Sequence, residues 1–147
     1  MRALALFSVA LVITVTSCKS KRPLPAPDPK EAADLPQATA LQKLREMLPT
    51  SDYIYCTAPK WNLKPSDIST WTVESDAITI DHGKGNKLRL AFGDITDVRL
   101  DQSGKYYYVK VHTLVQTDHD KAHFEFLFRS EDRSKQVAEL LLSLKKK

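Results

Sequence analysis

Seven short segments of the chain, all beyond residue 51, alternate apolar and polar side chains with a period of two. In the fourth of them, Leu88, Leu90 and Phe92 alternate with Lys87 and Arg89. Because successive side chains of a strand point to opposite faces, this pattern predicts β-strands with one buried and one solvated face, as in antiparallel sheets. The segments are residues 52–57, 69–74, 77–81, 87–92, 95–101, 106–115 and 123–129.

The last two segments supply a large share of the predicted core. One face of each is apolar, and the opposite face carries charged or polar side chains. The inward residues are Val109, Val111 and Val115 in the sixth segment, and Phe124, Phe126 and Phe128 in the seventh.

The four glycines all lie between these segments, where turns are needed. Gly83 and Gly85 predict a hairpin tip over residues 81–86, and Gly104 predicts a second hairpin tip, because glycine adopts the positive φ of such turns at little cost. Gly93 predicts a bulge or corner between two strands.

Two helices are expected to flank the strands. In residues 37–48, Leu41, Leu44 and Leu48 repeat at helical spacing, and Pro49 ends the pattern. This helix packs either on its own domain or on a partner. After the last strand, Ser130 is suited to cap a C-terminal helix. The apolar stripe of that helix consists of Val137, Leu140, Leu141 and Leu144.

The order of seven strands and a closing helix resembles the pleckstrin-homology-like fold, including its GRAM-type and small bacterial members. Residues 87–100 and 124–141 carry the likeness, which covers residues 52–147. It implies a mainly β domain: a bent seven-stranded antiparallel sheet, or partly open barrel, closed by the C-terminal helix. Phosphoinositide-binding members have an arginine-containing basic run in their first two strands. Only Lys60 and Lys64 stand in this stretch, so that activity is not inferred.

The first eighteen residues have the features of a signal peptide with its cleavage site. A basic start is followed by an uncharged run, residues 3–16, which is too short to span a bilayer comfortably. The run ends in Val15-Thr16-Ser17-Cys18, which resembles the lipobox of bacterial lipoproteins. The resemblance implies attachment of a diacylglycerol, with acyl chains such as palmitate, to its sulfur through a thioether, and cleavage of the peptide just before Cys18. The alternative is an ordinary secretory signal with a chance cysteine.

This signal predicts both the domain organisation and the compartment. An acylated chain faces the periplasm from a cell membrane or outer membrane without spanning it. In enteric bacteria an aspartate after the cysteine resembles an inner-membrane retention signal; Lys19 stands there instead, which favours the outer membrane. The expected parts are a signal peptide (1–17), the lipidated cysteine with a linker (18–36), a helix (37–49) and the β domain (50–147).

The expected linker is rich in proline. Alternating prolines favour an extended polyproline conformation and disfavour a helix. At about 3.1 Å per residue such a segment reaches roughly 50 Å. It is either a spacer that holds the domain away from the bilayer or plain disorder. The prolines are Pro23, Pro25, Pro27, Pro29 and Pro36.

Composition limits the partners. The chain has 147 residues, is 42% hydrophobic and 27% charged, and has a formal net charge of +4. This mild basic excess does not indicate a nucleic-acid binder, and the expected compartment argues against one. Membrane lipid, bound through Cys18, and an envelope protein are the expected partners.

One loop carries weak candidates for a metal site: Asp118, His119 and His123. Imidazole and carboxylate groups bind divalent metals. The histidines flank a turn, however, and no cysteine or third spaced histidine joins them, so the loop is expected to be solvated and to bind no metal. His82, at a glycine-rich tip, is expected to be exposed.

Aromatic and basic side chains suggest a binding surface. Tyr106, Tyr108, Lys110 and His112 share one face of a predicted strand, and Trp61 is expected to be an exposed contact residue. The alternative is an ordinary solvated face. Cys56 is either a buried packing residue or a reactive thiol.

No catalytic constellation or cofactor motif is recognised. Glycine-rich phosphate loops and nucleophile elbows are missing from the sequence. We therefore expect a lipid-anchored, non-enzymatic binding or scaffold domain at the cell envelope, with no cofactor. The alternative function is binding of a small envelope ligand, either a lipid headgroup or a metal ion.

Overall fold

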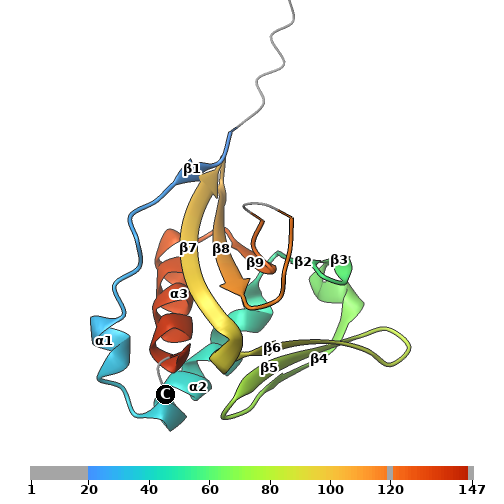
Figure 1. Cartoon of the computed structure of the whole chain (residues 1–147), viewed down its shortest axis with the longest axis horizontal. Helices are drawn as coiled ribbons and strands as arrows, with labels where there is room; N and C mark the ends of the chain where they lie inside the picture. The colour runs from blue at the N-terminus through green and yellow to red at the C-terminus, as the bar shows by residue number, and fades with distance from the viewer. Residues whose placement is uncertain (1–19, 119–120, 146–147) are drawn as a thin grey trace, which may run out of the picture.

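The computed structural model describes residues 20–118 and 121–145, and it is mainly β with three helices (Figure 1). Six strands form one antiparallel sheet, sheet A, in the order β1-β7-β8-β9-β2-β3. Its strands are β1 (Arg22–Pro23), β2 (Tyr53–Thr57), β3 (Lys60–Leu63), β7 (Ile95–Ser103), β8 (Tyr106–Thr113) and β9 (Phe124–Phe128).

A second antiparallel sheet, sheet B, has three strands in sequential order. They are β4 (Ile68–Val73), β5 (Ala77–His82) and β6 (Asn86–Ala91). The described strands of the two sheets share no ladder, so the sheets do not close into a barrel. The helices are α1 (Lys30–Ala33), α2 (Gln37–Met47) and α3 (Glu131–Lys145), and 3₁₀ turns span Leu48–Thr50, Pro65–Asp67 and Phe92–Asp94.

The expectation of a mainly β antiparallel domain with a C-terminal helix is confirmed. Each of the seven segments with alternating side chains overlaps a strand, while β1 and β3 were not expected. The sixth segment was drawn too long: β8 ends at Thr113, and Val115 is 40% exposed, outside the core. The chain turns away after Thr113, whose hydroxyl accepts a hydrogen bond from the Val115 amide.

Turns lie where the glycines predict them. At the β5–β6 tip, Gly83, Lys84 and Gly85 all have positive φ, and Gly104 has φ 60° at the β7–β8 tip. The corner expected at Gly93 is the 3₁₀ turn Phe92–Asp94, which carries the chain from sheet B to sheet A.

The core lies between sheet A, sheet B, α2 and α3. The inward faces of β8 and β9 are buried, and Leu141 of α3 is 0% exposed. Ser130 caps α3 as predicted, since its Oγ accepts a hydrogen bond from the Arg133 amide at 3.2 Å. Leu44 of α2 is also 0% exposed, and Arg45 donates to the Val73 carbonyl at 2.7 Å. The α2 helix therefore packs on its own domain.

The proline-rich segment does not extend freely from the domain. The short helix α1 forms within it, and β1 pairs with β7. The Leu24 amide donates to the Leu100 carbonyl at 2.9 Å, and Ala32 is only 5% exposed. Proline is tolerated here because β1 is an edge strand and Pro29 immediately precedes the first turn of α1. The expected spacer is thus largely attached to the domain.

Among residues 20–118 and 121–145, no helix has the length and apolar character needed to cross a membrane.

Candidate functional site

Four tyrosines gather on the outward face of sheet A, and we call them the tyrosine patch. Tyr53 and Tyr55 come from β2, and Tyr106 and Tyr108 come from β8. In both strands the tyrosines are out of phase with the buried inward residues, which are Ile54 and Cys56 in β2 and Val109 and Val111 in β8, so they share the solvated face. The strand β9 lies between β2 and β8 and brings the two pairs together.

The centre of the patch is apolar. Leu127 of β9 lies directly between Tyr53 and Tyr108 in the strand register. It points outward, yet it is only 3% exposed. Tyr53 and Tyr55 stack with their ring centroids 6.3 Å apart. The half-buried tyrosine rings therefore flank and shield an outward leucine.

Two hydroxyl groups of the patch have a raised pKa. Partial burial raises the pKa of Tyr55, and the neighbouring Tyr53 and Glu125 raise it further. Burial likewise raises the pKa of Tyr108, with additional effects of Tyr55 and Glu125. The patch thus presents aromatic rings, and the hydroxyls of Tyr55 and Tyr108 stay protonated so that they can donate and accept hydrogen bonds.

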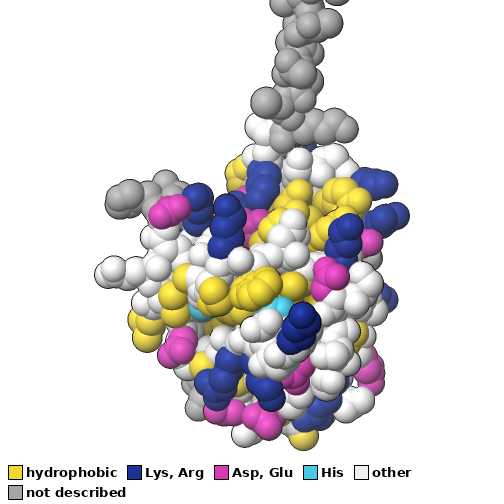
Figure 2. Space-filling view, turned by 90° about the vertical axis from the view of Figure 1, so that its right-hand side faces the viewer, with side chains coloured by type: hydrophobic (Ala, Val, Ile, Leu, Met, Phe, Trp, Pro, Cys, Tyr) yellow, Lys and Arg dark blue, Asp and Glu magenta, His cyan; other side chains and the backbone are white. Residues whose placement is uncertain are grey.

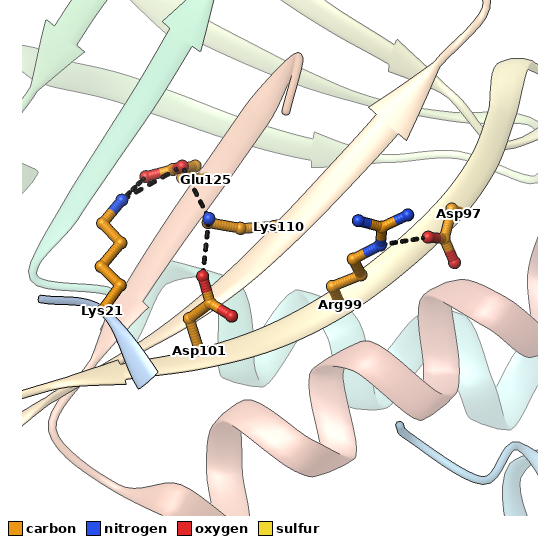
Figure 3. A network of polar contacts seen from close by, with 6 residues as sticks. All are labelled: Lys21, Asp97, Arg99, Asp101, Lys110 and Glu125. Carbon is orange, nitrogen blue, oxygen red and sulfur yellow. Dashed lines mark hydrogen bonds and ion pairs between the residues drawn. The ribbon is translucent and has the colours of Figure 1, made fainter. Parts of the chain in front are cut away.

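An ion-pair network borders the patch (Figure 3). Glu125 Oε2 lies 3.0 Å from Lys21 Nζ, and its other oxygen lies 4.0 Å from Lys110 Nζ. Lys110 also pairs with Asp101 at 2.6 Å, and both of these side chains are less than one-fifth exposed. Lys21 Nζ lies 4.3 Å from the centroid of the Tyr108 ring. The network attaches the N-terminal segment to the outward face of sheet A.

The border carries more positive than negative groups. Arg129 lies 5.7 Å and Lys105 5.5 Å from the centroid of the Tyr106 ring. Lys105 has no ion-pair partner among the described residues. Four basic side chains therefore face three carboxylates: Lys21, Lys105, Lys110 and Arg129 against Asp52, Asp101 and Glu125.

Most of the surface proposed from sequence lies on this one face. Tyr106, Tyr108, Lys110 and His112 all project outward from β8. Burial lowers the pKa of His112, and the nearby Arg99 lowers it further. Sequence reasoning missed Tyr53, Tyr55 and Lys21. The alternation of Tyr53 and Tyr55 with Ile54 and Cys56 shows that both tyrosines face outward, but it does not show which strand lies beside them.

Trp61 does not belong to this surface, and it is half-buried rather than exposed. It stands directly opposite Cys56 in the β2–β3 register, which places both side chains on the inward face. Its ring packs edge-on against His82 at 4.4 Å between centroids. His82 was expected to be exposed, but it is only 4% exposed and is covered by Trp61. Its Nε2 has no hydrogen-bond partner among the described residues.

The weak metal candidates do not assemble into a site in the described part of the chain. His123 Nε2 donates to the Ala58 carbonyl at 3.0 Å, and its Nδ1 accepts from the Thr113 hydroxyl at 2.7 Å. Both ring nitrogens are therefore occupied. Asp118 pairs with Lys121 at 2.7 Å, and that hydrogen bond lowers the pKa of Asp118. His119 lies outside the described residues. Residues 20–118 and 121–145 contain no cluster of three metal-ligating side chains.

Cys56 is a packing residue in this structure. It is 2% exposed, and burial raises the pKa of its thiol. Cys18 lies outside the described residues.

No family model, curated protein or solved structure matches the chain.

Proposed function

We propose that the protein is a bacterial envelope lipoprotein, anchored by acyl chains on Cys18, whose β domain is a non-enzymatic binding or scaffold domain. The sequence Val15-Thr16-Ser17-Cys18 supports the anchor. The domain would face the periplasm from a cell membrane or, given Lys19, from the outer membrane.

One observation carries the binding role: the tyrosine patch lies beside β1, the strand that follows Cys18 most closely in the chain. Lys21, which contacts both Tyr108 and Glu125, directly precedes β1. Tyrosine and arginine are enriched in interaction surfaces because they combine apolar contact area with hydrogen-bonding groups. The patch combines four tyrosines on one face with a basic border.

A relation to pleckstrin-homology-like domains forms part of this proposal. The succession of antiparallel strands in two sheets, followed by a C-terminal helix packed on the first sheet, supports it. The strands β1 and β3 and the helix α1 lie outside the pattern drawn from the sequence. The proposed binding role does not depend on this relation, since it stands on the patch.

The anchor is tested with Cys18→Ser, expressed as the full chain. The native protein should sediment with membranes and carry the added mass of its acyl chains. The variant should be released into the soluble fraction without that mass, because the thiol that accepts the lipid is gone. Membrane association with no added mass in the native protein would refute the lipoprotein assignment.

The scaffold role is tested by cross-linking in intact cells followed by mass spectrometry. Tyr106→Ser should reduce cross-linking through the patch, whether the cross-linked molecule is a lipid or a protein, whereas Tyr107→Phe on the opposite face serves as the control. If native mass spectrometry instead detects a bound lipid headgroup or metal ion, the small-ligand alternative is favoured.

A further inference from the structure

We propose that the tyrosine patch lies against the headgroup layer of an anionic bilayer. This deepens the proposed function, on whose lipid anchor it rests, and names the partner of the patch as the membrane surface itself.

The first argument is the length of chain between the anchor and the folded domain. Lys21 follows Cys18 by three positions, and extended chain spans at most about 3.6 Å per residue, or roughly 11 Å in total. Lys21 is held in place by Glu125 and by the Tyr108 ring. An acylated Cys18 therefore keeps the bilayer surface close to β1, whereas a free 18–36 spacer would have allowed a far larger separation.

The second argument is the position of the patch relative to that point. The register pairs Arg22 with Gln102 and Pro23 with Asp101, at the tip end of the β7–β8 hairpin. Tyr106 begins β8 directly after this tip, and Tyr108 opposes Asp101. Figure 1 shows β1 and this end of β7 and β8 together at the top of the molecule, with α2 at the bottom. The patch is thus at the end of the domain nearest the anchor.

The third argument is the chemistry of the surface. Tyrosine is favoured at membrane interfaces because its ring reaches the apolar boundary while its hydroxyl stays among the headgroups. The basic border adds electrostatic attraction to anionic lipid, as clusters of lysine and arginine near a membrane surface do. On the side of the molecule drawn in Figure 2, hydrophobic side chains form one group in the upper part, with Lys and Arg side chains at its border, and a second group across the middle.

The short connection also argues against a protein partner on the patch. A single helix with its side chains is about 10–12 Å wide. The reach from Cys18 to Lys21 is no larger, so little clearance remains beside β1 for a folded layer between the patch and the lipid. A protein partner would have to use another face of the domain.

The test places an environment-sensitive fluorophore at two lysine positions of the acylated full chain. Lys105→Cys labels the patch border, and Lys43→Cys labels α2 at the opposite end; both lysines are exposed. The introduced thiol is the only reactive one, because Cys18 is consumed by the lipid and Cys56 is 2% exposed. The labelled proteins are reconstituted in vesicles of phosphatidylethanolamine with phosphatidylglycerol, and in vesicles of phosphatidylcholine alone.

In the anionic vesicles, the label at position 105 should shift its emission to the blue. Lipids carrying a nitroxide on the headgroup should quench it several-fold more than the label at position 43. In phosphatidylcholine vesicles the difference between the two positions should shrink, because the electrostatic attraction is lost.

Two failures are distinguishable. If the protein carries its acyl mass and floats with the vesicles, but both labels are quenched equally, the apposition is refuted and the patch is free for a protein partner. If the native chain has no acyl mass and does not float, the anchor and the apposition are both refuted.

Discussion

Lys21 and Glu125 are 104 residues apart in the sequence, yet Lys21 Nζ lies 3.0 Å from Glu125 Oε2. This ion pair joins the N-terminal segment to the middle of sheet A. Lys21 is 38% exposed and Glu125 17% exposed, so the pair is at the surface and only partly shielded from water. Its importance is positional: it sets where the chain leaves the domain toward Cys18.

Lys21→Ala should therefore loosen the N-terminal segment without unfolding the domain. We expect a loss of about 0–1 kcal/mol of global stability, as for other surface ion pairs. The Leu24 amide, which donates to the Leu100 carbonyl, should exchange with deuterium distinctly faster. Lys43→Ala is the control, and equal exchange at Leu24 in both variants would show that Lys21 does not hold the segment.

A chain beginning at Gln37 should fold into a mainly β domain, but it should be less stable than one beginning at Ser20. Removing residues 20–36 takes away β1, α1 and the partly buried Leu24 and Leu35, which pack against the core. The expected loss is on the order of 1–4 kcal/mol, given about 25 cal/mol per Å² of apolar surface. Denaturant midpoints of the two chains measure it, and identical midpoints would mean that the segment does not pack on the domain.

Leu141→Ala should destabilise the domain strongly. Leu141 is 0% exposed beneath sheet A, and truncating a buried leucine costs about 2–5 kcal/mol through lost transfer energy and the cavity left behind. This is a large part of the roughly 5–15 kcal/mol that stabilises a domain. Gln136→Ala, at an exposed position of the same helix, should change little in the same denaturant melt. Equal small effects would mean that α3 is not packed on the sheet.

Acidification should destabilise the fold through His123. Burial lowers the pKa of His123 below its ordinary value of 6.5, with partial compensation from its hydrogen bond to Ala58. The unfolded chain therefore binds the proton first as the pH falls. The contribution of His123 to stability is fully present above pH 6.5 and is lost as the pH drops through and below that value.

The measurement is the free energy of unfolding at several pH values on both sides of 6.5. His123→Gln keeps a donor and an acceptor but cannot titrate, so its stability should fall less on acidification. The pKa of His112 is lowered as well, so some pH dependence should remain in this variant. An unchanged pH profile would show that His123 is not responsible.

A chelator should leave the melting temperature unchanged. His123 uses both ring nitrogens within the protein, and Asp118 is paired with Lys121. Thermal melts with and without EDTA provide the measurement. A large drop on chelation would show that the loop holds a structural metal after all.

Local pattern predicted seven of the strands and the two longer helices, but not β1, β3 or α1. The alternation in residues 87–92 and the stripe from Val137 to Leu144 depend only on side-chain periodicity, so strand and helix could be assigned without knowing their neighbours. The same is true of Ser130 as a helix cap and of Gly93 as a corner. Tyr106, Tyr108, Lys110 and His112 could be placed on one face for the same reason.

Only the tertiary structure decided which faces met. The strand β9 separates β2 from β8, and this non-local order brings Tyr53 and Tyr55 beside Tyr106 and Tyr108. Trp61 was expected to be exposed, but its pairing with Cys56 in the β2–β3 register places its side chain on the inward face. The attachment of residues 20–36 depends on the pairing of the edge strand β1 with β7 and on the ion pair between Lys21 and Glu125, which are far apart in the sequence. Sheet order, register and long-range packing arise from the summed burial of distant segments, which local periodicity does not encode.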